Sequence, residues 1–178
     1  MTLAEKIVAI HEALERQRVP HAFGGAIALA YYTLDPRGTS DVDLNVFVPE
    51  RTPEAALAAL PEGIADRESA MAAILESGQA RLWWGENPVD IFFDNVPIHD
   101  AARANSRKVP FADTEIPILG PIELAAFKTL FNRTRDWADL EAMVSAGTLD
   151  IVAAAESAAE LAGADDPRIA RIRALASR

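Results

Sequence analysis

Two aspartates one residue apart, Asp41 and Asp43, stand at the start of the apolar run 44–48. Apolar and more polar positions alternate over residues 41–48, which predicts a strand. Side chains at i and i+2 of a strand point to the same face, so the two carboxylates concentrate negative charge there. A divalent cation such as Mg²⁺, which prefers oxygen ligands, is the simplest way to offset that charge. The tripeptide alone is also common as surface decoration.

The residues before the aspartate pair separate it from two enzyme classes that use the same Asp-x-Asp tripeptide. Haloacid-dehalogenase phosphatases and many sugar-nucleotide glycosyltransferases place it at the end of an apolar strand. Here polar residues 37–40 precede the pair, and the apolar strand follows it. The carboxylates lie at the start of their strand, which disfavours both classes.

A glycine pair, Gly24 and Gly25, precedes a compact apolar segment at residues 26–32 that we predict to be helical. Glycines before a helix let backbone N–H groups approach phosphate oxygens, and a helix N-terminus favours anions. A tight strand-to-helix turn would also explain the two glycines. The spacing from Gly25 to Asp41 accommodates one short helix and a return into an adjacent strand, which would bring the glycines and the carboxylates to one cleft.

The whole pattern predicts an α+β fold, with a mixed β-sheet core flanked by helices and a short C-terminal helical tail. Thr2 and Glu5 form a capping box for the first helix, and Thr52 is the expected N-cap of a helix with Pro53 at its first position. Residues 34–38 are rich in turn formers. Expected helices are 3–17, 67–77, 122–131, 136–144, 150–161 and 167–176; expected strands are 80–84, 89–93 and 116–119. We predict a core at 1–119 and a helical region at 120–178 packed on it.

Composition sets outer limits on the class of protein. Half of the 178 residues are hydrophobic and a quarter are charged, which is ordinary for a globular chain. No apolar stretch has the length of a membrane span, and residues 1–20 do not resemble a signal peptide. The absence of cysteine excludes disulfides and thiolate metal sites. We expect a cytoplasmic protein without a membrane partner.

Charge is unevenly distributed. The formal net charge of -10 argues against broad electrostatic binding to nucleic acid. Residues 103–135 nevertheless carry six basic and three acidic side chains, which is either ordinary surface charge or a basic wall near a phosphate-bearing substrate. The three histidines, His11, His21 and His99, do not show a metal-ligand spacing, and we interpret each as structural.

The glycine pair, short helix and Asp-x-Asp strand resemble the polymerase-beta-like nucleotidyltransferase superfamily. The segment Arg37-Gly38-Thr39-Ser40-Asp41-Val42-Asp43-Leu44 is similar to a bacterial subgroup that contains AbiEii-type toxins and small stand-alone relatives. Lincosamide nucleotidyltransferases have a similar layout. The resemblance covers roughly residues 23–47. It implies that Asp41 and Asp43 hold Mg²⁺ or Mn²⁺, and that the nucleotide contacts Gly24, Gly25, Arg37 and Thr39.

The superfamily pattern includes a third acidic residue on a neighbouring strand. Asp90 interrupts the apolar segment 89–93, a costly place for a lone charge without a metal or partner. Asp94 lies on the same face of the strand and is the alternative candidate for the third acid. Asp90 could also be an aspartate on an edge strand that faces water and has no catalytic role. Asp90 is the expected third metal ligand and general base.

The tail carries a weaker match to the same subgroup. Lys128, followed by Arg133, Arg135, Asp136 and Asp139, is similar to its helical segment. The resemblance implies that Lys128 reaches the nucleotide phosphates while Asp139 holds the helices or the lysine in place. A solvated lysine on a helix face is the alternative. The tail is shorter than that of larger AbiEii-type proteins.

The function implied by the resemblance is a metal-dependent nucleotidyltransferase. It would move a nucleoside monophosphate from a triphosphate such as ATP to an acceptor hydroxyl and release pyrophosphate. The acceptor would be a tRNA end, a hydroxyl on a partner protein such as an antitoxin, or a small molecule such as an antibiotic. The alternative from another class is a nucleotide-binding or antitoxin-like module that keeps the fold without catalysis.

Overall fold

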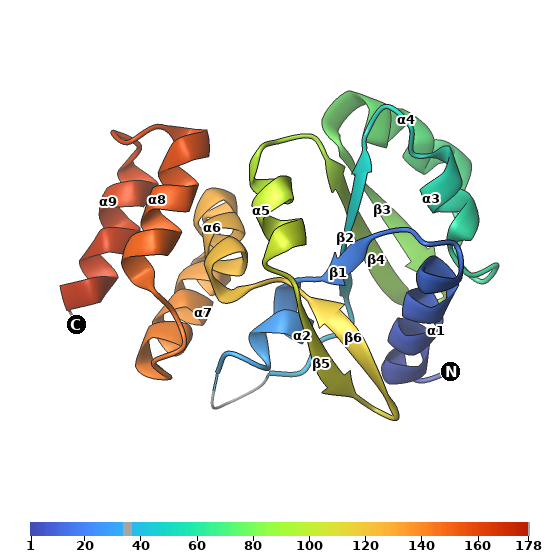
Figure 1. Ribbon diagram of the computed structural model, residues 1–178, viewed down its shortest axis with the longest axis horizontal. Coiled ribbons are helices and arrows are strands. Elements are labelled where there is room, and N and C mark those ends of the chain that lie inside the picture. Colours follow the sequence, from blue (N-terminus) through green and yellow to red (C-terminus); the bar gives the residue numbers. More distant parts are fainter. Residues whose placement is uncertain (34–36, 178) are drawn as a thin grey trace.

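The computed structural model describes residues 1–33 and 37–177, so residues 34–36 of the expected turn segment lie outside it. Within these residues the chain forms a six-stranded mixed sheet with helices packed around it (Figure 1). This arrangement confirms the predicted α+β class. The N-terminal helix and the C-terminal helices lie at opposite ends of the long axis of the molecule.

The strand order across the sheet is β3-β4-β2-β1-β6-β5. β1 is antiparallel to β2 and parallel to β6, while β2 and β4 are parallel. The hairpins β3–β4 and β5–β6 form the two outer pairs. The strands are β1 (His21–Phe23), β2 (Val42–Pro49), β3 (Gln79–Trp84), β4 (Asn87–Asp94), β5 (Arg107–Phe111) and β6 (Thr114–Ile118).

The helices follow the apolar periodicity of the sequence. Thr2 caps α1 as expected, since its hydroxyl accepts from the Glu5 N–H while the Glu5 carboxylate accepts from the Thr2 N–H. The helices are α1 (Leu3–Arg16), α2 (Gly25–Leu29), α3 (Glu54–Ala59), α4 (Arg67–Ser77), α5 (Ile98–Ala104), α6 (Pro121–Phe131), α7 (Thr134–Ser145), α8 (Ile151–Ala162) and α9 (Pro167–Ala174), with a 3-10 turn at Leu175–Ser177. No described helix is both long enough and apolar enough to cross a membrane.

The central strand β2 begins at Val42, one residue later than expected. Val42, Leu44 and Val46 are buried in the main core, which the alternating pattern predicts. Asp43 and Asn45 project from the opposite face. The strand therefore packs one face in the core and presents the other to a polar site.

Three details of the sequence prediction are wrong or incomplete. Pro53, not Thr52, is the N-cap of α3, because the Thr52 hydroxyl instead donates to the Pro49 carbonyl. The helix α5 and the strand β5 were not expected; β5 carries two basic residues and a proline, and its pairing partner β6 stabilises it. The hairpin turn is shorter than expected, since β4 already begins at Asn87.

The C-terminal helices pack through small side chains. Ala154, Ala155 and Ala158 of α8 are buried, and α8 contacts α6 and α9. Small residues allow helix backbones to approach closely, which explains why an alanine-rich tail forms a compact layer. This layer stands beside α6 and α7, away from the sheet hairpin β5–β6 (Figure 1).

Candidate active site

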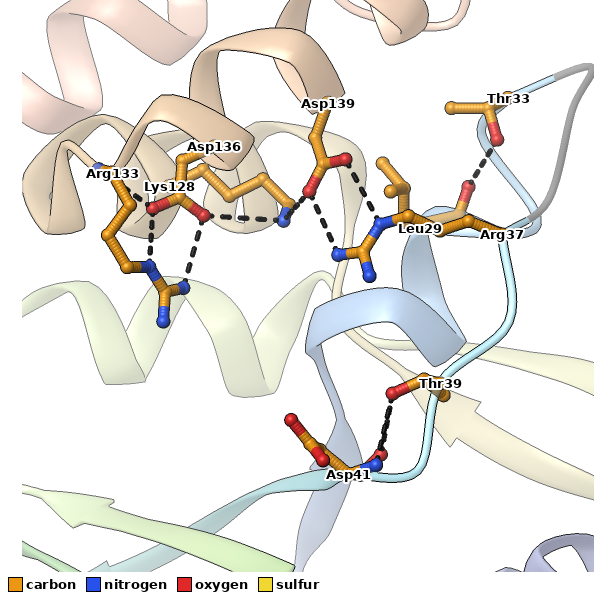
Figure 2. Close-up of polar contacts among 9 residues, drawn as sticks. All are labelled: Leu29, Thr33, Arg37, Thr39, Asp41, Lys128, Arg133, Asp136 and Asp139. Atoms are coloured by element: carbon orange, nitrogen blue, oxygen red, sulfur yellow. Dashed lines mark hydrogen bonds and ion pairs between the residues drawn. The ribbon is translucent and has the colours of Figure 1, made fainter.

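Strands β2 and β4 bring two of the expected carboxylates together. They are parallel neighbours, with Asp43 directly opposite Asp90. Asp41 lies immediately before β2, where the Thr39 hydroxyl accepts from its backbone N–H at 3.1 Å and the Ser40 hydroxyl donates to its carboxylate at 2.8 Å. Thr39 therefore holds the turn that presents Asp41 (Figure 2).

A cavity of about 440 Å³ opens beside these carboxylates. Seven of the residues expected from the sequence line it: Gly25, Arg37, Thr39, Asp41, Asp43, Asp90 and Lys128. In the described part of the chain, Gly24 and Asp94 are not among the lining residues. The cavity walls include residues of β2, β3, β4, α2, α5, α6, α7 and α8, so they join the sheet to the C-terminal helices.

Gly25 lies directly against Asp43. Its φ of +51° is in the left-handed region that glycine adopts without steric cost. A Cβ at this position would overlap the Asp43 carboxylate. The Gly24 N–H donates to the Asp43 backbone carbonyl at 2.8 Å, so this N–H is already satisfied within the protein. Of the two glycines, Gly25 faces the cavity, and it leaves room for a carboxylate.

The Asp43 carboxyl is electrostatically strained. Burial, followed by the neighbouring charges of Asp90 and Asp41, raises its pKa to about 6, although Lys128 and Arg133 act in the opposite direction. A raised carboxyl pKa means that the ionised form lacks sufficient compensation from the protein. A cation at this position would supply it.

Arg81 of β3 holds the third carboxylate. Its Nε and Nη2 donate to the two oxygens of Asp90, both at 2.7 Å. Arg81 stands opposite Asp90 in the β3–β4 register, which explains the two-pronged geometry. The hydrogen bonds and charge of Asp90 raise the pKa of Arg81 further. An aspartate in an apolar strand requires a partner for its charge, and in this structure the partner of Asp90 is Arg81.

The carboxylate set fits a hard divalent cation in chemistry and charge, because Mg²⁺ and Mn²⁺ take oxygen ligands. Asp41, Asp43 and Asp90 share one cavity, and Asp43 is left undercompensated. Their oxygens do not all approach within 4.8 Å of one another; among the described residues, only His11, Glu15 and His21 do so. Joint coordination by all three aspartates therefore requires their side chains to move closer together.

A chain of ion pairs forms the wall above the carboxylates (Figure 2). Lys128 Nζ donates to Asp139 at 2.6 Å, and Arg37 donates to the same carboxylate at 3.2 and 3.3 Å. On the other side, Lys128 lies 3.7 Å from Asp136, which pairs with Arg133 at 2.8 Å. Three cations face two anions, so the network is positive.

Lys128 is the buried centre of this network, with 4 % of its surface exposed. The alternative of a solvated lysine on a helix face is therefore wrong. Burial alone raises the pKa of Asp139, but hydrogen bonds from Arg37 and Lys128 outweigh it and hold that pKa below its usual value. The arginines are more accessible than the lysine, with side-chain exposures of 32 % for Arg37 and 68 % for Arg133.

The basic stretch 103–135 divides in space. Lys128, Arg133 and Arg135 line the cavity, which agrees with a basic wall at a phosphate site. Arg103, Arg107 and Lys108 are not among the lining residues of the described chain and are exposed. Three of the six basic residues in this stretch therefore belong to the cavity wall, and the net charge of the stretch does not distinguish them from the other three.

Part of the cavity lining is apolar. Phe92 and Phe131 form a tilted aromatic pair with ring centroids 6.0 Å apart, and Phe127, Leu130 and Leu161 also line the space. The Arg133 guanidinium lies 5.1 Å from the centre of the Phe131 ring, so apolar and charged lining residues adjoin.

No family model matches the sequence, and no curated protein sequence matches it. Among solved structures, an antigenic nucleotidyltransferase-like protein from Paracoccidioides brasiliensis aligns with a TM-score of 0.53 and 16 % identity, over 95 % of this chain and 85 % of the other. The antibiotic-resistance factor ANT(2'')-Ia, in complex with adenylyl-2''-tobramycin, aligns with a TM-score of 0.51 and 14 % identity, over 100 % and 99 % of the two chains. A solution structure of ANT(2'')-Ia gives a TM-score of 0.50.

The chain has a nucleotidyltransferase-like fold.

Within this nucleotidyltransferase-like fold, the residues that sequence reasoning missed are those that pair with the expected ones. Arg81 is one of them: the expected four-residue turn would place Trp83 opposite Asp90, and only the shorter turn of the structure brings Arg81 to that position. Arg133 and Asp136 were noted only as parts of a motif. The resemblance implies that Asp139 holds the helices or Lys128, and the structure shows the ion pair between these two residues. The second contact of Lys128, to Asp136, has no sequence signal because it depends on how α6 packs against α7.

Proposed function

We propose that this protein is a metal-dependent nucleotidyltransferase that transfers a nucleoside monophosphate from a nucleoside triphosphate to an acceptor hydroxyl. The observation that carries the proposal is the cluster of Asp41, Asp43 and Asp90 in one cavity, with the Asp43 pKa raised to about 6. An uncompensated carboxylate beside a net positive ion-pair network suits a cation and a polyphosphate together. The fold likeness supports the same class.

Asp41 and Asp43 are the proposed ligands of Mg²⁺ or Mn²⁺, with Asp90 joining them when it leaves Arg81. When bound, the cation neutralises phosphate charge and stabilises the charge that develops during transfer. Asp90 is also the proposed base, accepting the proton of the acceptor hydroxyl as that oxygen attacks the α-phosphorus and pyrophosphate leaves. Gly25 leaves the space in which Asp43 stands.

The phosphates are proposed to contact the accessible cations of the network. Half-buried Arg37 and exposed Arg133 stand at its two ends, and both line the cavity. Lys128 is buried between Asp136 and Asp139, which supports a role in holding these two ends in place. Thr39 is proposed to act through its hydrogen bond to the Asp41 backbone.

We propose a division of the chain into the core 1–119 and the helical region 120–178, with the cavity between them. The carboxylates belong to the first region, whereas Lys128, Arg133 and the apolar residue Leu161 belong to the second. The helical region therefore completes the site, in addition to packing on the sheet.

We further propose that this protein belongs with the small bacterial AbiEii-type and stand-alone enzymes, because it carries the sequence motif Arg37-x-Thr39-x-Asp41-x-Asp43. A toxin of that kind would modify a tRNA end or a partner protein. The structure of ANT(2'')-Ia contains an adenylylated antibiotic, so antibiotics belong in the same acceptor test. The apolar wall of the cavity supports a small-molecule acceptor.

Radiolabelled triphosphates, one base at a time, test the class of reaction. The protein is incubated with Mg²⁺ and a cell extract separated into tRNA, protein and small molecules, with an aminoglycoside added to the last. Label from the α-phosphate should enter one fraction, and γ-label should not. Retention of γ-label in product, or no transfer to any fraction with Mg²⁺ or Mn²⁺, contradicts the proposal.

The variants Asp90→Asn and Asp94→Asn then assign the third carboxylate. Asp90→Asn should abolish most transfer, on the order of 10²-fold or more, while triphosphate binding stays within a few-fold. Asp94→Asn is the matched control, because this residue lies on the same strand but does not line the cavity. Full transfer by Asp90→Asn would remove its proposed role as base.

A further inference from the structure

Three side chains far from the aspartates in sequence form a second cluster of metal-ligand type. His11 and Glu15 are one helical turn apart on α1, and His21 begins β1. One ligand atom from each lies within 4.8 Å of the other two. The two imidazoles are close, with His11 Nδ1 3.0 Å from His21 Nε2. This cluster lies outside the residues that line the candidate active site.

The orientation of His21 is fixed by the backbone. Its Nδ1 lies 2.8 Å from the Val19 carbonyl oxygen, which can only accept, so Nδ1 carries the proton. Nε2 of the neutral ring is then an acceptor, with its lone pair directed at His11. A histidine that ligates a metal through one nitrogen usually donates from the other to a carbonyl or carboxylate. His21 already has that arrangement.

The distances allow an ion to enter with small movements. Two nitrogens that bind one Zn²⁺ at about 2.0 Å in a tetrahedral arrangement lie roughly 3.3 Å apart. The observed separation of 3.0 Å is slightly shorter. In the metal-free form His11 Nδ1–H donates to His21 Nε2; on binding, the His11 proton moves to its Nε2 and Nδ1 becomes a ligand. His11 only changes tautomer: it keeps one ring proton and stays neutral, so no proton is gained or lost.

The charges around the cluster favour a cation on the side where Glu15 meets solvent. Both histidines are buried, with exposures of 7 % and 4 %, while Glu15 is exposed and can close over an ion that enters from solvent. Glu12 adds a second nearby negative charge, and Lys108 of β5 opposes them.

We propose that His11, Glu15 and His21 form a second metal site, selective for a borderline transition metal such as Zn²⁺ over Mg²⁺. Two imidazoles and a carboxylate suit Zn²⁺, whereas Mg²⁺ prefers oxygen ligands alone. Three protein ligands leave a fourth position for water. The ion would connect the last turn of α1 to the first residue of β1, and β1 leads directly into Gly24 and Gly25.

Zn²⁺ binding is measured by competition with a chromophoric chelator on EDTA-treated, dialysed protein. The wild type and the triple variant Asp41→Asn/Asp43→Asn/Asp90→Asn should both bind one Zn²⁺ at this site, because the triple variant lacks only the aspartate cluster. His21→Gln and Glu15→Gln should bind it at least tenfold more weakly, since even second-shell changes cost about 10–100-fold in affinity. Glu12→Gln is the matched control on the same helix, with a change of no more than a few-fold.

Two further readouts keep the proposal testable if His21→Gln fails to fold. Glu15 is exposed, so Glu15→Gln should fold and still lose the site. Co²⁺ in the triple variant should show the intense visible bands of a tetrahedral site, and Lys108→Gln should tighten Zn²⁺ binding. Absence of those bands, no Zn²⁺ bound by the triple variant, or equal affinities in wild type and Glu15→Gln would each overturn the proposal.

Discussion

Arg81 and Asp90 face each other across the β3–β4 hairpin and share two hydrogen bonds of 2.7 Å. The arginine side chain is 54 % exposed, so it can swing into solvent, whereas Asp90 is 21 % exposed. The pair therefore joins a mobile cation to a carboxylate at the cavity wall. Metal binding by Asp90 and pairing with Arg81 are competing uses of the same oxygens.

The first prediction concerns this competition. Arg81→Gln should tighten Mn²⁺ binding several-fold at pH 7.5, because Asp90 no longer has to leave a guanidinium. The cost to stability should be about 1 kcal/mol or less, as expected for an accessible ion pair. Calorimetry with Mn²⁺ measures the affinity, and Arg173→Gln, an exposed arginine on α9, is the control. Weaker binding in Arg81→Gln would show that the arginine supports the bound state instead.

The second prediction follows from the raised pKa of Asp43. The folded protein holds this proton more tightly than the unfolded chain, whose carboxyl pKa is near 3.8. Metal-free stability should therefore fall as pH rises from about 4 to about 6 and stay low above that. Asp43→Asn should remove this loss and be more stable than wild type at pH 7.5 in EDTA, by on the order of 1–2 kcal/mol.

Urea unfolding at several pH values, with EDTA or with Mg²⁺, measures the effect of Asp43. Mg²⁺ should stabilise the wild type at pH 7.5 more than at pH 5, and should not stabilise Asp43→Asn. Glu156→Gln, an exposed carboxylate on α8, controls for net charge. Equal stability of wild type and Asp43→Asn at pH 7.5 in EDTA would mean that the Asp43 charge is already compensated.

The third prediction concerns the glycine turn. Gly25→Ala places a methyl group on the Asp43 carboxylate in a backbone conformation with φ of +51°. It should cost at least about 1 kcal/mol from the left-handed backbone alone and should also displace Asp43. Mn²⁺ affinity should therefore fall together with stability. Gly38→Ala is the control, since its Cβ would meet nothing within 4 Å; a Gly25→Ala protein with normal metal binding would reduce Gly25 to an ordinary turn.

The fourth prediction concerns the buried centre of the ion-pair network. Asp139→Asn leaves Lys128 with only the longer contact to Asp136, so it should lower the free energy of unfolding by about 2 kcal/mol. Triphosphate affinity should also fall, because Arg37 loses its anchor. Asp166→Asn is the control, since it weakens an accessible pair with Arg168 and keeps a capping side chain. An unchanged denaturation midpoint in Asp139→Asn would contradict the inferred role of the network.

Local patterns in the sequence predicted most of the fold. The capping box at Thr2, the alternation in β2 and the helix 67–77 depend on neighbouring residues, and each is found in the structure. The helix α5 and strand β5 have no such local pattern. β5 depends on its pairing with β6 and was invisible to periodicity.

Individual site residues were predictable from the sequence, whereas most contacts between residues of different elements were not. The position of Asp43 opposite Asp90 follows from adjacent strands, but strand order is a long-range property. The burial of Lys128 between two aspartates depends on the packing of α6 and α7. His11 and His21 meet because α1 returns the chain to β1 through a tight loop, which their spacing alone does not reveal.

The pairing of the three-residue strand β1 affects when the site can form in the nascent chain. Phe23 pairs with Ile118 of β6, and the Leu119 N–H donates to the Phe23 carbonyl at 2.9 Å, so the segment just before the glycine turn is clamped by residues far downstream. Chains leave the ribosome N-terminus first, and contacts between distant residues form late. The aspartates of β2 therefore emerge long before the wall that faces them. We therefore expect the cavity to be complete only after α8, which contributes Leu161 to its lining, has been synthesised.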